Sequence, residues 1–260
     1  MASHHARRTT HDARLLTRRH MLRVAAGSAL SVVVSQSLIG CDATQVANAA
    51  TSSDSTSTTT PSCVLTAALT EGPYFVDERL LRSDIRADPV TGAISAGVPL
   101  GLTFNVSRVA SGACTPLTGA YLDVWHCDAG GVYSDVSGAG TGEKFLRGYQ
   151  ITDASGVAQF TTVYPGWYSG RAVHIHFKLR LFAGASTSYE FTSQFFFNES
   201  LTDVVHAQSP YSLKGRRNTL NSTDGIYNSL SSVEKSALTL QPIASGDGYA
   251  GVINLGVQVG

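Results

Sequence analysis

From residue 100 onwards, hydrophobic and polar residues alternate in short stretches. A period of two is typical of β-strands that bury one face. Turn-forming pairs such as Gly130-Gly131 and Pro165-Gly166 separate the stretches, so the sequence predicts a mostly β protein built as a β-sandwich. Little helix is expected, with a turn or two at 233–238. The expected strands are 100–110, 120–126, 145–152, 158–163, 172–181, 189–197 and 250–259.

The first 41 residues carry the features of an export signal. Arg18-Arg19 is a twin-arginine pair, and the moderately apolar stretch 24–39 after it is too short and too polar to span a membrane. The sequence Leu38-Ile39-Gly40-Cys41 resembles a bacterial lipobox, in which the cysteine is lipidated and becomes the new N-terminus. We therefore predict twin-arginine export and lipidation of Cys41. Cleavage near Ala49, after a small-x-small sequence, is the alternative.

A low-complexity segment separates this signal from the alternating region. Nine of the ten residues from 51 to 60 are serine or threonine, which is typical of a flexible tether. We therefore divide the chain into a signal segment at 1–41, a linker at 42–62 and a folded domain at 63–260.

Charge is unevenly distributed along the chain. Residues 1–41 carry six arginines and one acid, although the formal net charge of the whole chain is zero. The rest keeps 13 basic and 18 acidic residues and is mildly acidic, which argues against nucleic acid as a partner.

The cysteines fit an oxidising compartment. With Cys41 assigned to the lipobox, three cysteines remain, and the simplest arrangement is one disulfide and one buried thiol. Cys63 opens the folded domain, and Cys114 lies in the polar loop after the first long strand. We predict a Cys63–Cys114 disulfide and a free, buried Cys127.

Candidate chemistry centres on His174-Ile175-His176. Alternate residues of a strand share a face, so both imidazoles point one way, as a pair of metal ligands would. A chance pair on a surface strand is the alternative. An Fe(II) site of two histidines and a carboxylate is not favoured, because the next acid is Glu190. Tyr133 and Tyr168, at loop ends, offer phenolate donors suited to Fe(III), although each also fits the rim of a sandwich.

Several short motifs follow one another between residues 70 and 197. They are Glu71-Gly72-Pro73-Tyr74, Asp123-Val124-Trp125-His126, Gly131-Val132-Tyr133-Ser134, Leu146-Arg147-Gly148, Thr152-Asp153, the stretch 160–168, and Arg171-Ala172-Val173-His174-Ile175-His176. In this order and spacing they resemble the intradiol ring-cleavage dioxygenases, the family of catechol 1,2-dioxygenase and protocatechuate 3,4-dioxygenase.

The resemblance implies one non-haem Fe(III) per chain and cleavage of a catechol-type ring by O₂ between its two hydroxylated carbons, to a muconate-type dicarboxylic acid. Catechol, hydroxyquinol, protocatechuate and lignin-derived catechols are all compatible substrates. The implied partners are a small aromatic diol and O₂. Membrane contact is expected only through a lipid on Cys41, and the oligomeric state stays open. The implied metal ligands are Tyr133 and His174 as the equatorial pair and Tyr168 and His176 as the axial pair.

Other roles follow from the same resemblance. Tyr168 is expected to act also as a base, and Arg171 to bind the substrate and stabilise its developing charge. Gln194 is expected to orient the pocket, and Tyr74 to form part of the pocket wall.

Two other functions share some of these features. A tethered β-sandwich that binds sugars or a protein would show the same strands and linker, and a zinc hydrolase would share the histidine pair. Among the remaining residues, we expect His126 to be hydrogen-bonded inside the sandwich and His206 to lie on the surface. Arg147 is expected to bridge acids near the site or to be solvated.

Overall fold

The computed structural model describes residues 64–259. The predicted signal at 1–41, the predicted linker at 42–62, Cys41 and Cys63 lie outside the described residues. Within them, no helix is long and apolar enough to cross a membrane.

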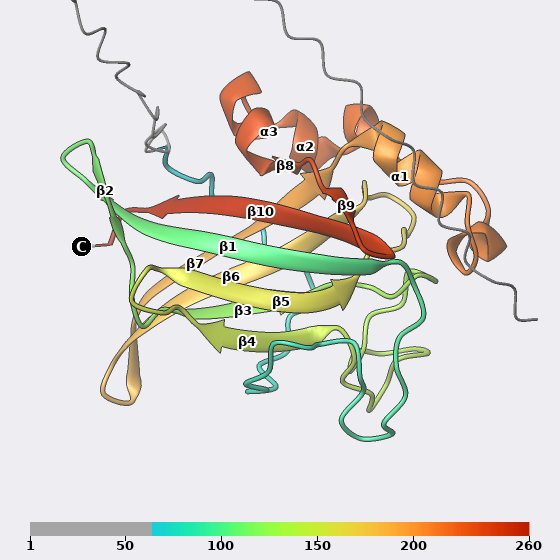
Figure 1. The fold of residues 1–260 in the computed structure, drawn as a ribbon, viewed down its shortest axis with the longest axis horizontal. Coiled ribbons are helices and arrows are strands. Elements are labelled where there is room, and N and C mark those ends of the chain that lie inside the picture. The colour runs from blue at the N-terminus through green and yellow to red at the C-terminus, as the bar shows by residue number, and fades with distance from the viewer. Residues whose placement is uncertain (1–63, 260) are drawn as a thin grey trace, which may run out of the picture. The chain divides into compact units, whose positions relative to one another are not determined.

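The described residues form two five-stranded sheets that pack as a sandwich (Figure 1). In the first sheet, the central strand β1 pairs in parallel with β10 and antiparallel with β5 and β2. In the second sheet the order is β4-β3-β6-β7-β8. The first sheet contains β1 (Pro99–Ala110), β2 (Ala113–Pro116), β5 (Val157–Val163), β9 (Ile243–Ser245) and β10 (Gly248–Val257). The second contains β3 (Tyr121–Trp125), β4 (Arg147–Ile151), β6 (His174–Ala183), β7 (Ser186–Phe197) and β8 (Thr239–Leu240).

The alternation along each strand decides which side chains meet between the sheets. Phe104 of β1 faces Phe177 of β6 and Phe195 of β7 with ring centroids 6.0 Å apart, and all three rings are buried. In β6, Ile175, Phe177 and Leu179 point into this core and are fully buried. The residues between them therefore point to the outer face of the second sheet. That outer face is where the histidine pair lies.

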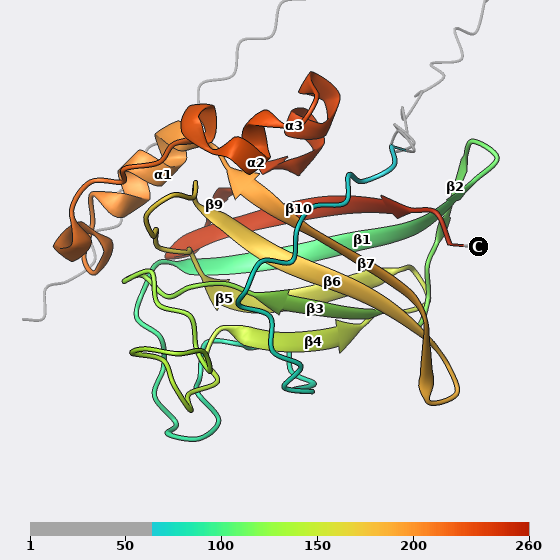
Figure 2. The same cartoon turned by 180° about the vertical axis from the view of Figure 1, so that it is seen from behind.

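An irregular N-terminal segment covers the outer face of the second sheet. Leu69 donates a backbone hydrogen bond to Thr192 of β7, and Tyr149 of β4 donates one to Leu80. The segment therefore crosses the sheet from β7 to β4, as Figure 2 shows. This cover explains why polar side chains on the outer face are buried.

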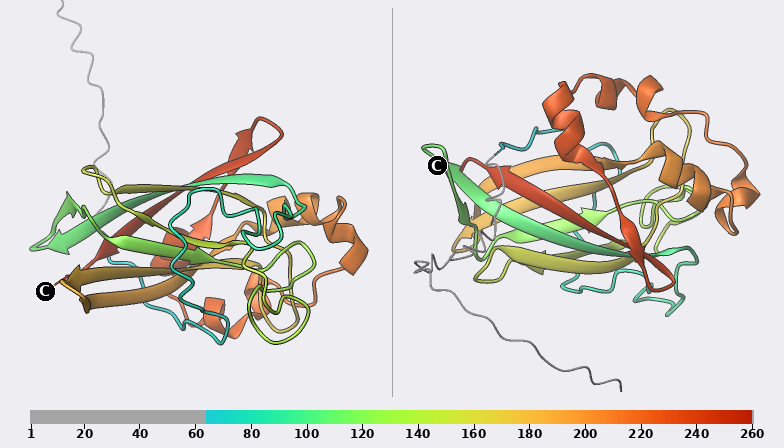
Figure 3. Two further views of the ribbon diagram at one scale, coloured as in Figure 1. Left: turned by 90° about the horizontal axis from the view of Figure 1, so that it is seen from below. Right: turned by 45° about the horizontal axis from the view of Figure 1, so that its top comes forward.

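Short helices fill the connection between β7 and β8. They are α1 (Glu199–His206), α2 (Gly225–Asn228) and α3 (Ser232–Leu238), with 3₁₀ turns η1 (Tyr211–Lys214) and η2 (Asn221–Thr223). Side chains of Asn198, Asp224 and Ser231 cap the N-termini of α1, α2 and α3 in turn. Figure 3 shows the helices gathered next to the end of β7.

The mostly β sandwich expected from the sequence is confirmed, and each expected strand overlaps an observed one. The helix expected at 233–238 corresponds to α3. The sequence pattern did not indicate α1, or the short strands β2, β8 and β9.

Candidate active site

Four side chains meet where β3 ends and β6 begins. His174 and His176 stand on the outer face of β6, Tyr133 lies in the loop after β3, and Tyr168 lies in the loop after β5. The His174 Nε2 atom is 3.0 Å from His176 Nε2, 3.2 Å from the Tyr168 hydroxyl and 3.4 Å from the Tyr133 hydroxyl. The four donors named as metal ligands from the sequence are thus brought together at one point.

Hydrogen bonds alone do not account for the three groups that lie around His174 Nε2. His174 Nδ1 lies 2.6 Å from the carbonyl of Ala172, which can only accept, so Nδ1 carries the proton. The Nε2 atom of neutral His174 then has a single lone pair, and three groups face it. Such crowding of donors around one point is typical of a metal site.

The spacing of the donors also fits a metal ion. Two ligands about 2.1 Å from one ion lie about 3.0 Å apart at a right angle and about 3.4 Å apart at a tetrahedral angle. No group of three His, Cys, Asp or Glu in the described part of the chain could hold a metal. A metal ion held here would therefore take the two phenols as further ligands, and phenolate oxygens suit Fe(III) better than Zn²⁺.

Burial prepares the histidines and tyrosines for opposite charge states. Burial lowers the pKa of His174 to about 3 and that of His176 well below its usual value, so both are neutral at pH 7. Burial also raises the pKa of Tyr168 to about 12 and that of Tyr133 well above its ordinary range. A phenolate forms here only if a cation compensates its charge, as a bound metal ion would.

Backbone contacts hold the two tyrosine loops against each other. The carbonyl of Asp128 accepts from the backbone N–H of Gly131 at 2.9 Å and of Gly166 at 3.1 Å. Gly131 has a φ of +81°, and any side chain there would collide with the carbonyl of Trp167. The glycine therefore permits the close approach that brings Tyr133 and Tyr168 to the same point.

Arg171 is oriented by two neighbours. Its Nε donates to Asp224 Oδ2 at 2.9 Å, and its Nη2 donates to Gln194 Oε1. Gln194 stands opposite His176 in the β6–β7 pairing and donates through Nε2 to the Thr70 carbonyl at 3.2 Å. The structure thus places Arg171 and Gln194 beside the two histidines and two tyrosines, in one hydrogen-bonded chain.

Asp224 was not identified from the sequence. It is fully buried, and its carboxylate accepts from Arg171 and from the backbone N–H groups of Ala172, Ile226 and Tyr227. Burial raises the pKa of Asp224, but these backbone hydrogen bonds and the Arg171 guanidinium outweigh it and hold the pKa below its usual value. Asp224 both caps α2 and holds Arg171. The sequence around Asp224 contains no motif that indicates its contact with Arg171.

Tyr74 lies directly over the site. Its ring stacks on Tyr133 with centroids 4.4 Å apart and an interplanar angle of 23°, and it meets Tyr168 edge-on at 5.9 Å. On the other side, the His176 ring stacks on Trp125 at 4.9 Å. Aromatic rings therefore flank the donor set on two sides, which suits contact with an aromatic ring.

Two further histidines lie inside the fold. His126 is fully buried and hydrogen-bonds Cys127 O at 2.8 Å and Thr162 Oγ1 at 2.7 Å, so its internal role is confirmed. The surface position expected for His206 is wrong. His206 is buried because its ring stacks on Tyr211 at 5.0 Å and its Nε2 donates to the Pro165 carbonyl at 3.0 Å.

Arg147 neither bridges acids nor is solvated. It is buried, and its guanidinium donates to the backbone carbonyls of Ser134 and Tyr74. The expectation was wrong because the Thr70–Glu78 segment, which has no strand pattern, covers this end of β4.

The cysteines fall into two kinds. Cys127 is a free, buried thiol, and burial raises its pKa to about 12. Cys114 is disulfide-bonded. The disulfide to Cys63 stays a prediction, because Cys63 lies outside the described residues.

A protein-family model and a known dioxygenase match the sequence of this chain. The family model described as Dioxygenase matches residues 70–224, which is more than half of the chain. Chlorocatechol 1,2-dioxygenase from Rhodococcus opacus is 29% identical in an alignment of 133 positions, which covers 44% of this chain and 51% of that protein. The match thus spans about half the length of this curated relative.

Solved structures are also similar. An intradiol ring-cleavage dioxygenase from Tetranychus urticae superposes with a TM-score of 0.63 and 29% identity, over 75% of this chain and 95% of that one. The dioxygenase domain of a dioxygenase carbohydrate-binding protein fusion from Streptomyces sp. SirexAA-E gives a TM-score of 0.52 and 28% identity, over 76% of this chain and all of that domain. The family match, the fold and the two-tyrosine, two-histidine site agree, and this chain belongs to the intradiol ring-cleavage dioxygenase family.

Proposed function

We propose that this protein is a non-haem Fe(III) dioxygenase that opens a catechol-type ring between its two hydroxylated carbons. O₂ is the second substrate, and a muconate-type dicarboxylic acid is the product. The observation that carries the proposal is the convergence of Tyr133, Tyr168 and His176 on the Nε2 atom of His174. Neither a zinc hydrolase nor a sugar-binding module requires two phenols at this point.

The four converging side chains would hold the iron through two phenolate oxygens and two imidazole nitrogens. When bound, Fe(III) would draw electron density from a catecholate and so make a ring carbon reactive toward O₂. The neutral state of both histidines and the exclusion of water favour binding of a cation here.

Of the two tyrosines, Tyr168 is the better candidate for a base. Tyr133 is 4% exposed and lies beneath the Tyr74 ring, whereas Tyr168 is only half-buried. Tyr168 also stands two residues before Gly170, which has a φ of +89°. A catechol that binds as a dianion adds two negative charges to a water-poor site, where uncompensated charge is costly. Tyr168 would take up one of the two substrate protons at its phenolate oxygen and so offset one of these charges, while the other proton would pass to hydroxide derived from solvent.

The remaining groups position the substrate and stabilise charge. Arg171 has its Nε and Nη2 atoms committed to Asp224 and Gln194, which leaves Nη1 without a protein partner among the described residues. Nη1 can therefore donate to negative charge that develops on the substrate. Tyr74 would contact the substrate ring from the side of Tyr133.

Metal content and colour test this proposal directly. The purified protein should hold about one Fe(III) per chain and be coloured red to purple by charge transfer from the two phenolates. Oxygen uptake with a panel of catechols should identify the substrate. A colourless protein that is fully active with zinc, or with no metal, would refute the proposal.

We also propose that the enzyme is exported by the twin-arginine route and works in the cell envelope or outside it. The support is the Arg18-Arg19 pair, the lipobox ending at Cys41 and the Ser/Thr-rich linker. Arg18→Lys with Arg19→Lys should block export of the folded protein. Cys41→Ser should move it from the membrane to the soluble fraction, and unchanged fractionation would favour cleavage near Ala49 instead.

A further inference from the structure

Residues 70–78 form a strap across the outer face of the second sheet. Buried or half-buried side chains of the sheet hold it at several points along its length. Lys178 of β6 pairs with Glu71, and its Nζ lies 4.1 Å from the centroid of the Phe75 ring. Arg180 of the same strand pairs with Asp77 at 2.9 Å. These contacts fix the strap on the sheet but do not reach the ring of Tyr74.

Arg147 holds the strap at Tyr74 itself, through the backbone carbonyl of that residue. It is the first residue of β4 and only 2% exposed. Its Nη1 donates to the carbonyl of Tyr74 at 2.7 Å, and its Nε donates to the carbonyl and hydroxyl of Ser134 at 3.0 and 2.9 Å. Ser134 directly follows Tyr133. One guanidinium therefore joins the backbone at both rings of the Tyr74–Tyr133 stack.

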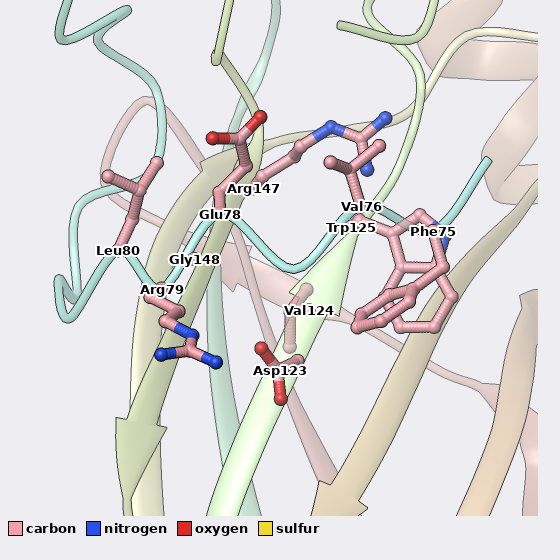
Figure 4. Close-up of a pocket in the computed structure, with 10 residues that line it drawn as sticks. All are labelled: Phe75, Val76, Glu78, Arg79, Leu80, Asp123, Val124, Trp125, Arg147 and Gly148. Carbon is pink, nitrogen blue, oxygen red and sulfur yellow. The ribbon is translucent and has the colours of Figure 1, made fainter. Parts of the chain in front are cut away.

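The surroundings of Arg147 suit a positioning role better than a simple ion pair. No carboxylate among residues 64–259 lies within 4.0 Å of its nitrogens. Glu78, which is drawn with Arg147 in Figure 4, pairs with Lys144 instead. The Arg147 carbonyl accepts from Arg82 Nε at 2.9 Å, which fixes the backbone. A buried cation that bonds only neutral groups is costly, and the planar fork that reaches two segments at once is available to arginine and not to lysine.

We propose that Arg147 is a positioning residue that holds Tyr74 over Tyr133 and thereby sets the pocket wall against which the substrate ring packs. This inference rests on the proposed dioxygenase function. Because the Tyr74 ring also meets Tyr168 edge-on, a shift of the strap would change the space open to an aromatic ring on this side of the site. Arg147 itself touches neither the metal-binding atoms nor the substrate.

The test compares Arg147→Lys with Arg217→Lys. Arg217 also carries a buried guanidinium, but it pairs with Glu199 and Asp203 of α1, away from the strap. Arg147→Lys keeps the charge and loses the fork, so the KM for catechol should rise about tenfold while kcat changes much less. Arg217→Lys should leave both constants close to the wild-type values. An unchanged KM in folded Arg147→Lys would overturn the proposal.

A double variant tests whether the effect passes through Tyr74. If it does, adding Arg147→Lys to Tyr74→Ala should raise KM no further, whereas independent contributions would multiply. Multiplied effects would contradict the positioning role. If Arg147→Lys does not fold, Ser134→Ala removes one acceptor of Arg147 Nε and should raise KM in the same direction, by about two- to threefold.

Near-ultraviolet circular dichroism of the metal-free protein gives a readout that does not depend on turnover. Arg147→Lys and Tyr74→Ala should both lose the aromatic signal of the Tyr74–Tyr133 stack, and Arg217→Lys should keep it. If the wild-type protein cleaves no catechol, the proposed dioxygenase function is refuted, but the spectral test of Arg147 still applies. If folded Arg147→Lys keeps the wild-type spectrum, the positioning role of Arg147 is refuted, and the proposed dioxygenase function is not affected.

Discussion

Replacing Asp224 by asparagine tests how the site is anchored to the fold. The Asp224 Oδ2 atom accepts from Arg171 Nε at 2.9 Å and from the backbone N–H of Ala172 at 2.7 Å. Asparagine can keep the α2 cap through its carbonyl oxygen, but its amide group then faces these two donors. Two charge-assisted hydrogen bonds are lost, each worth about 1.5–3 kcal/mol. Because Arg171 is partly exposed and can be rehydrated, we expect a net loss of about 2–4 kcal/mol in the free energy of unfolding.

Urea unfolding and steady-state kinetics would measure the two consequences. Asp224→Asn should unfold at lower urea, and its kcat should fall more than its KM rises because Arg171 is no longer held. Asp203→Asn is the matched control, since Asp203 is an exposed partner of Arg217, and its effect should stay below about 1 kcal/mol. The pKa of Asp224 is depressed, so its contribution is present above the unfolded pKa and is lost as the pH falls through the folded pKa. Wild-type stability and kcat in Asp224→Asn would refute this reasoning.

Three further predictions concern the metal ligands, the buried histidine and the thiols. Tyr168→Phe should shift the absorption band and abolish most turnover, while Tyr189→Phe on β7 should leave both unchanged; equal spectra would contradict ligation by Tyr168. Burial lowers the pKa of His126 to about 4, so stability should fall as the pH drops from about 6.5 toward 4, and His126→Gln should flatten that slope in urea titrations. Peptide mapping without reduction should link Cys63 to Cys114, and a peptide joining Cys127 to either would contradict the pairing.

The alternating strands were predictable because one face of each meets the core between the sheets. The histidine pair follows from the same rule, since Ile175 points inward and its neighbours outward. What joins this pair to Tyr133 and Tyr168 is the packing of the two tyrosine loops against each other, and only resemblance to a family indicated it.

Residues held by distant contacts were not predictable. Asp224 lies 53 residues after Arg171, and only the tertiary fold brings the N-terminal cap of α2 within hydrogen-bonding distance of it. His206 is buried by Tyr211 and by the Pro165 carbonyl, neither of which marks it in the sequence. The short strands β2, β8 and β9 span two to four residues, too few for alternation to be recognised.

The position of ring cleavage tests the central claim most directly. In the proposed site two phenolates would stabilise Fe(III), which would activate the catecholate rather than O₂, so attack would begin at a carbon that bears a hydroxyl. With catechol as substrate under ¹⁸O₂, mass spectrometry should identify cis,cis-muconic acid that carries both labelled oxygen atoms. A yellow semialdehyde would show cleavage beside the diol and would contradict the roles given to Tyr133 and Tyr168, whatever the iron content.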